Sequence, residues 1–103
     1  MKKNLMFGIA GLIIAFGVQT QAEAMQWNTA RPGYTFRSFN LRVAAPDACR
    51  EACFNNRYCR AWTYVKPYTL YGSQPRCLLK NAVPPPRRDR CCVSGVKSSR
   101  YRY

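Results

Sequence analysis

The sequence has no histidine and only four acidic residues, and these shortages exclude several kinds of catalytic chemistry. A cysteine nucleophile and a ribonuclease-like reaction both lack the base that histidine usually supplies. Hydrolysis of a glycan requires two carboxylates on either side of the scissile bond. Asp47 and Glu51 have structural roles as helix-dipole and arginine partners, and Asp89 is surrounded by arginines. We therefore predict no catalytic residues.

Long apolar stretches are also scarce, because the longest run, residues 5–18, has only 14 residues. A helix needs about 20 apolar residues to span a bilayer. Two lysines precede the run and the motif Ala-Glu-Ala, ending at Ala24, follows it, as in a cleaved secretory signal peptide. An uncleaved anchor helix is the alternative. We predict that residues 1–24 are a signal peptide and that the chain is exported, to the periplasm or the extracellular space. No transmembrane segment is expected after cleavage.

Cleavage leaves 79 of the 103 residues, which are too few to bury a large hydrophobic core. An even set of six cysteines can supplement that core in an oxidising compartment. Their spacing contains no C-x2-C pair, so we expect no metal site, no redox motif and no cofactor. The predicted role is structural disulfide bonding, by Cys49, Cys53, Cys59, Cys77, Cys91 and Cys92.

Positive charge is plentiful, since 15 basic and three acidic side chains follow residue 24, giving a net charge of +12. Such a field attracts polyanions, including acidic glycans, nucleic acid and anionic lipid headgroups. The alternative is that the charge only keeps an exported protein soluble. We expect an anionic protein or glycan ligand, and no specific recognition of nucleic acid.

Hydrophobic periodicity and turn residues predict one helix and several short strands. The helix covers residues 44–56, with Pro46 in its first turn. The other predicted segments are one strand or two at 31–43, further strands at 59–65, 76–80 and 91–97, a loop at 66–75, a proline-stiffened connection at 81–90 and a basic-aromatic tail at 98–103. The predicted fold class is α+β, with one short helix packed on a small antiparallel sheet in a single domain of residues 25–97.

The first four cysteines have a geometry that favours two pairs. Cys49 and Cys53 are four residues apart on the predicted helix, so both sulfur atoms leave the same face. We expect each of these two helix cysteines to form a disulfide with a cysteine of the sheet. Bonding of Cys53 to Cys59 would close the turn after the helix, and bonding of Cys49 to Cys77 would attach its other end to a strand.

The adjacent pair Cys91 and Cys92 leaves two possibilities open. Elimination joins them to each other, yet neighbours in a strand point to opposite faces and a bond between them requires a distorted peptide. One of them could equally bond a partner molecule.

Two segments carry candidate ligand-binding residues, which are Lys66, Tyr68, Tyr71, Arg87, Arg88 and Arg90. The first three combine a charge with amphipathic rings in a predicted loop. The last three form the densest basic cluster, and their guanidinium groups suit carboxylate, sulfate or phosphate. A solvated connector is the alternative for these arginines. Trp62 and Tyr64 could stack on sugars, but aromatic residues of a central strand usually fill the core.

Four segments resemble a PAN/Apple domain: CREAC at 49–53, YCRAWTYVKP at 58–67, RCLLKNAVPPP at 76–86 and CCVSGV at 91–96. The resemblance covers residues 31–97 and is to the short form found in many exported bacterial proteins. It implies a helix cradled by a curved antiparallel sheet, two disulfides joining helix to sheet, and a non-catalytic module that binds proteins or carbohydrates. Larger Apple domains add a disulfide between the chain ends, for which no cysteine precedes Cys49.

We therefore predict an exported module that binds an anionic glycan or an acidic protein surface. Two alternatives are a cationic membrane-active protein and a structural part of a cell-surface assembly linked through Cys91 or Cys92.

Overall fold

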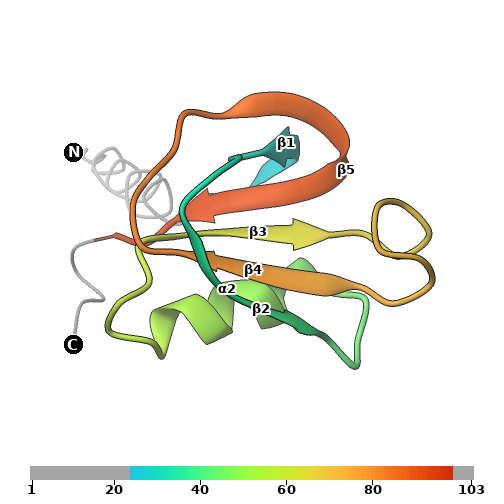
Figure 1. Cartoon of the computed structure of the whole chain (residues 1–103), viewed down its shortest axis with the longest axis horizontal. Helices are drawn as coiled ribbons and strands as arrows, with labels where there is room; N and C mark the ends of the chain where they lie inside the picture. Colours follow the sequence, from blue (N-terminus) through green and yellow to red (C-terminus); the bar gives the residue numbers. More distant parts are fainter. Residues whose placement is uncertain (1–23, 99–103) are drawn as a thin grey trace, which may run out of the picture.

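The computed structural model describes residues 24–98, which contain five strands and one helix (Figure 1). In chain order these elements are β1 (Gln26–Ala30), β2 (Thr35–Asn40), α2 (Pro46–Phe54), β3 (Ala61–Val65), β4 (Arg76–Lys80) and β5 (Arg87–Val96). The prediction of one short helix on a small antiparallel sheet is confirmed. The predicted signal peptide, apart from Ala24, and the predicted tail, apart from Ser98, lie outside the described residues.

The five strands form one sheet in the order β1-β5-β3-β4-β2, and all neighbouring strands are antiparallel. β1 and β2 are consecutive in the chain but occupy opposite edges. The link between them, residues 31–34, therefore crosses one face of the sheet, whereas α2 lies against the other face (Figure 1). Because both faces are covered, every residue of β3 is buried.

The face under α2 holds the main hydrophobic core. α2 begins at Pro46, whose fixed φ and missing N–H suit the first turn of a helix. It directs Cys49 and Cys53 toward the sheet, where both are fully buried. Alternate residues of the central strands meet them there, namely Trp62, Tyr64, Leu79 and Val93. Trp62 and Tyr64 therefore belong to the core.

Gly95 of β5 is opposite Trp62 of β3 and leaves room for its indole ring. A Cβ atom at position 95 would lie 2.6 Å from the nearest ring carbon, which is shorter than any van der Waals contact. The close approach of the ring to the backbone thus requires glycine at this position.

Three disulfides lie within the described chain. Cys49 is bonded to Cys77 of β4, and Cys53 is bonded to Cys59 just before β3. Cys91 is bonded to its neighbour Cys92, so none of the six cysteines is free.

Both sulfurs of the adjacent pair belong to the cluster on the face opposite α2, because β5 is irregular at this point. Residues 89–92 have no partner on β1, since the register passes from Arg88 opposite Thr29 to Val93 opposite Trp27. This extra length bends the strand, as Figure 1 shows, and frees both side chains from the usual alternation.

Two strand boundaries differ from the sequence prediction. No strand is expected at 26–30, yet β1 forms there as an edge strand, where a polar sequence is tolerated. The prediction of a connection through residue 90 was wrong after the third proline, because β5 begins at Arg87. Arg87 and Arg88 pair with Ala30 and Thr29 of β1, a partner too distant in the sequence for local patterns to reveal.

Candidate functional site

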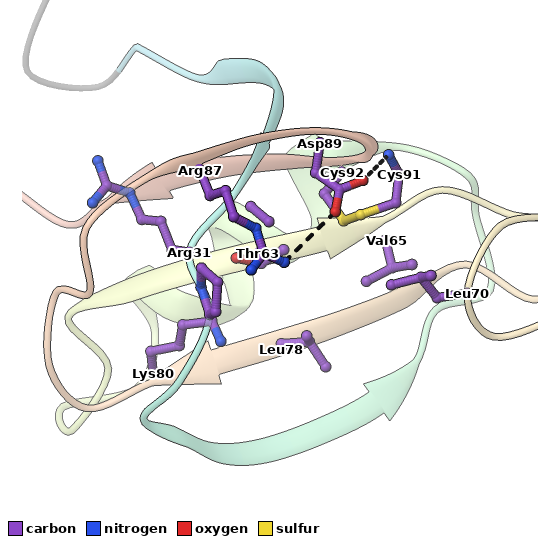
Figure 2. A pocket seen from close by; sticks show the side chains of 12 residues that line it. Arg31, Thr63, Val65, Leu70, Leu78, Lys80, Arg87, Asp89, Cys91 and Cys92 are labelled. Carbon is purple, nitrogen blue, oxygen red and sulfur yellow. Dashed lines mark hydrogen bonds and ion pairs between the residues drawn. A yellow bond between two sulfur atoms is a disulfide. The ribbon is translucent and has the colours of Figure 1, made fainter.

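The face of the sheet opposite α2 contains a pocket of about 150 Å³, which we call the inner pocket (Figure 2). Its floor comes from β3 and β4, and its cover comes from residues 30–32 and from the first half of β5. Leu70 of the loop between β3 and β4 completes the wall. The crossing link and the bent strand therefore create the pocket together.

The inner pocket has two chemically different ends (Figure 2). Arg31 and Lys80 lie at one end, and Val65, Leu70 and the Cys91–Cys92 disulfide lie at the other. Val65, Cys91 and Cys92 are buried in one apolar cluster, whereas Leu70 is largely exposed.

Arg31 is a buried cation whose hydrogen-bond partners among the described residues are all neutral. Its Nη1 atom donates a hydrogen bond to the carbonyl oxygen of Pro84, and its Nε and Nη2 atoms donate to Oε1 of Gln26 at 3.3 and 2.9 Å. The residue is 8% exposed, and this burial lowers the pKa of its guanidinium from the ordinary value. No carboxylate within residues 24–98 forms an ion pair with it.

Lys80 is buried more deeply, with 2% of its surface exposed. Its Nζ atom donates to the carbonyl oxygen of Gly33 at 3.1 Å and to Oγ1 of Thr35 at 2.7 Å. Both acceptors are neutral and belong to the chain that crosses the sheet. Desolvation lowers the pKa of Lys80 below its ordinary value of 10.5. A third ammonium N–H has no acceptor among the described residues.

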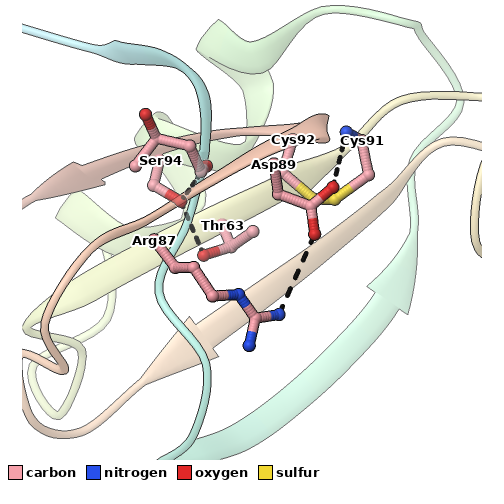
Figure 3. Close-up of polar contacts among 7 residues, drawn as sticks. Thr63, Arg87, Asp89, Cys91, Cys92 and Ser94 are labelled. Carbon is pink, nitrogen blue, oxygen red and sulfur yellow. Dashed lines mark hydrogen bonds and ion pairs between the residues drawn. A yellow bond between two sulfur atoms is a disulfide. The ribbon is translucent and has the colours of Figure 1, made fainter.

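A hydrogen-bonded network fixes the middle of the inner pocket (Figure 3). The Ser94 hydroxyl donates to the carbonyl oxygen of Thr29 at 2.8 Å, so in the 2.8 Å contact between Thr63 and Ser94 the Thr63 hydroxyl is the donor. These bonds join three strands, because Thr29, Thr63 and Ser94 come from β1, β3 and β5.

Asp89 positions the adjacent disulfide and partly neutralises Arg87. Its Oδ1 atom accepts a hydrogen bond from the backbone N–H of Cys91 at 3.1 Å (Figure 3). Its Oδ2 atom lies 3.8 Å from Nη2 of Arg87, an ion pair that is partly exposed. The charged groups that line the inner pocket are Arg31, Lys80 and Arg87 against the single carboxylate of Asp89, a net charge of +2.

A second hollow of about 340 Å³ lies where β1 meets the start of β5, and we call it the outer hollow. Trp27 is 60% exposed there, and Arg87 and Arg88 line it from β5. No acidic residue lines the outer hollow. The Arg88 guanidinium has neither a hydrogen bond nor an ion pair with any residue that the structure describes.

Lys66 reaches the outer hollow through Asn28. Its Nζ atom donates to Oδ1 of Asn28 at 2.8 Å, and Asn28 lines the hollow. Asn28 has φ = 54°, a conformation that asparagine tolerates better than most residues, and it stands at the irregularity between Trp27 and Thr29. The structure thus brings Lys66, Arg87 and Arg88, three of the predicted ligand-binding residues, to one surface.

The other three predicted residues line neither hollow. Tyr68 is largely exposed, and the ring of Tyr71 is covered by the guanidinium of Arg76, which lies 4.8 Å from its centroid. Arg90 is exposed. The next residue, Cys91, accepts a hydrogen bond at its carbonyl oxygen from the backbone N–H of Lys66 at 2.8 Å, so the loop that begins at Lys66 lies close to Arg90.

Sequence reasoning missed Trp27, Arg31 and Lys80. Trp27 stands alone in a short polar stretch, without the alternation that predicts a strand. Lys80 ends a predicted strand where a charged residue normally faces water, and it is buried only because residues 31–34 cross above it. The proximity of Arg31 to Lys80 depends on the same crossing, for which the sequence has no local signal.

The PAN domain family matches residues 29–80, about half of the chain. The chain belongs to this family. The match includes β2, α2, β3 and β4 with two disulfides, but not β5 or the Cys91–Cys92 pair. PAN domains are generally non-catalytic modules that bind proteins or carbohydrates, and such disulfides are typical of secreted proteins. No curated protein matches the chain.

Within residues 24–98, no helix is both long and apolar enough to cross a membrane.

Proposed function

We propose that this PAN domain is an exported, non-catalytic module that binds an anionic glycan at the outer hollow. The observation that carries the proposal is an exposed tryptophan beside an arginine that has no partner in the described chain, Trp27 beside Arg88. An exposed indole ring offers a flat apolar surface to the face of a sugar ring, and a guanidinium fork offers paired donors to a carboxylate or sulfate.

The charge around the outer hollow supports an acidic rather than a neutral glycan. Arg87 and Arg88 line it, Lys66 is hydrogen-bonded to one of its residues, and no carboxylate lines it. A longer glycan would continue toward Arg90 and the exposed ring of Tyr68, with Tyr71 as a further contact. These three residues are secondary in the proposal because they neither line the outer hollow nor form a hydrogen bond with a residue that lines it.

The structure does not favour the two alternatives from the sequence. Both Cys91 and Cys92 are bonded internally, so neither is free to link the chain to a partner. α2, the helix of the described residues, has nine residues and directs its buried cysteines toward the sheet. A membrane-bound amphipathic helix would instead need an unoccupied apolar face.

A glycan array that compares acidic with neutral glycans at two salt concentrations tests the proposed function. We expect binding to sulfated or uronic-acid glycans, and a loss of ~10-fold or more in affinity between about 50 and 200 mM salt. Trp27→Ala and Arg88→Gln should each weaken binding by ~10-fold or more. The control is Arg57→Gln, an exposed arginine that lines neither hollow and makes the same change in charge. Binding that is unaffected by salt and by both variants would exclude the outer hollow as the site.

A further inference from the structure

We infer that the inner pocket is a second binding site, separate from the outer hollow, and that it takes a small organic carboxylate with a hydrocarbon body. The inference does not depend on glycan binding.

The size of the inner pocket limits the ligand. A dry apolar cavity of about 150 Å³ is large enough to hold benzene, so the hydrocarbon body would contain about six carbon atoms. A glycan chain is too large for this space, which separates the ligand of the inner pocket from that of the outer hollow.

The positive end of the pocket determines the head group. Arg31 and Lys80 are both at least nine-tenths buried, and each has only neutral hydrogen-bond partners. A buried charge without a counterion is unfavourable, so an anion beside the Lys80 ammonium, which has one N–H without an acceptor in the described chain, would relieve the desolvation of Lys80 and add a counter-charge to the end where Arg31 also lies. Asp89 does not supply the missing charge, because it lies with the disulfide, contacts Arg87 and accepts the Cys91 N–H.

The apolar end determines the rest of the molecule. Val65, Leu70 and the Cys91–Cys92 disulfide carry no charge and form a wall away from Arg31 and Lys80, and Leu78 lies between the two ends (Figure 2). An inorganic anion would leave this wall uncovered, and a neutral hydrocarbon would leave the two cations without a counterion. A carboxylate joined to a short hydrocarbon matches both ends at once.

The test is a calorimetric and NMR titration of the disulfide-bonded chain with hexanoate, 1-hexanol and inorganic phosphate. We expect hexanoate to bind at least ~10-fold more tightly than either of the other two, because only hexanoate satisfies both ends. The amide signals of Val65, Leu78 and Cys92 should shift during the hexanoate titration. Equal binding of hexanol or of phosphate, or no binding of hexanoate, overturns the inference.

Two variants locate the site. Lys80→Met keeps the length of the side chain and removes its charge, so it should weaken hexanoate binding by ~10-fold or more. Arg57→Met makes the same change in charge at an exposed position outside the pocket and should leave binding unchanged. The thermal melting of each variant shows whether it remains folded.

Leu70→Glu provides a test that does not depend on a buried substitution, because Leu70 is 64% exposed. A carboxylate at the apolar end should weaken hexanoate binding by ~5-fold or more through repulsion and loss of apolar contact. Gln74→Glu adds the same charge to the same loop at an exposed position outside the pocket and is the matched control. Equal effects of the two variants would overturn the inference. The two proposals can fail separately. If only the glycan proposal is wrong, Trp27→Ala leaves glycan binding unchanged, while Leu70→Glu still weakens hexanoate binding.

Discussion

At the scale of single residues, Lys80 shows how a charged side chain can become part of the interior. Its ammonium group is held by a backbone carbonyl and a hydroxyl of the crossing chain, Gly33 and Thr35. These two bonds replace part of the hydration that the ammonium group loses on burial, but they do not neutralise its charge. The lowered pKa follows from that desolvation.

Lys80 should make the stability of the protein depend on pH. Its folded pKa lies below 10.5, so the folded state releases the proton before the unfolded state does. The desolvation penalty is complete below the folded pKa and decreases as pH rises from there toward 10.5. We expect the free energy of unfolding of the wild type to increase relative to that of Lys80→Met over this window, measured by urea unfolding. A difference between the two proteins that stays constant with pH would contradict the prediction.

Gly95 gives a prediction about packing. In Gly95→Ala the new methyl group meets the Trp62 ring at 2.6 Å, so the ring or the strand must move. We expect the free energy of unfolding to fall by about 1–3 kcal/mol, the usual cost of overpacking.

A double-mutant cycle isolates this contact. Trp62→Phe removes Cζ2, the ring atom nearest to position 95, so Gly95→Ala should cost less in that background than in the wild type. Equal costs in the two backgrounds would show that the destabilisation has another origin.

At the scale of elements, two disulfides fasten α2 to the sheet at different sequence distances. Cys49 and Cys77 are separated by 28 residues, whereas Cys53 and Cys59 are separated by six. A crosslink that closes a longer loop removes more conformational entropy from the unfolded chain. The two bonds therefore contribute unequally, although they anchor neighbouring turns of one helix.

Paired replacement by alanine tests this difference. Loss of the longer crosslink, in Cys49→Ala with Cys77→Ala, should reduce the free energy of unfolding by about 3.6 kcal/mol in the chain-entropy model. Loss of the shorter one, in Cys53→Ala with Cys59→Ala, should reduce it by about 2.4 kcal/mol. Both double variants place alanines in the same buried cluster, so each is a control for the cavity that the other creates. The reverse order in chemical denaturation would contradict the entropic explanation.

At the scale of the whole molecule, the sequence predicts what depends on local signals. Pro46 marks the start of the helix, the spacing of Cys49 and Cys53 places both sulfurs on one face, and the alternation around Trp62 predicts a buried strand. Each signal lies within a few residues of the structure that it predicts, which is why the α+β arrangement could be anticipated.

The candidate site could be predicted only in part, because most of it depends on contacts between distant segments. Arg87 and Arg88 were chosen for their charge and line the outer hollow, and Lys66 is hydrogen-bonded to Asn28 at its edge, but Trp27 joins them only through the pairing of β1 with β5. Lys80 and Arg31 enter one pocket because the chain crosses the sheet between its two edges. A single sequence contains no local pattern that specifies either event.

The placement of β1 beside β5 also sets an order of assembly. The first strand of the described chain has its only sheet neighbour in the last strand, and the two are about sixty residues apart. A chain made from its amino end must therefore hold residues 26–30 unpaired until residues 87–96 have been synthesised. Closure of the inner pocket by β5 is then one of the final steps of maturation, and a protein truncated before its last strand would lack that part of the pocket's cover.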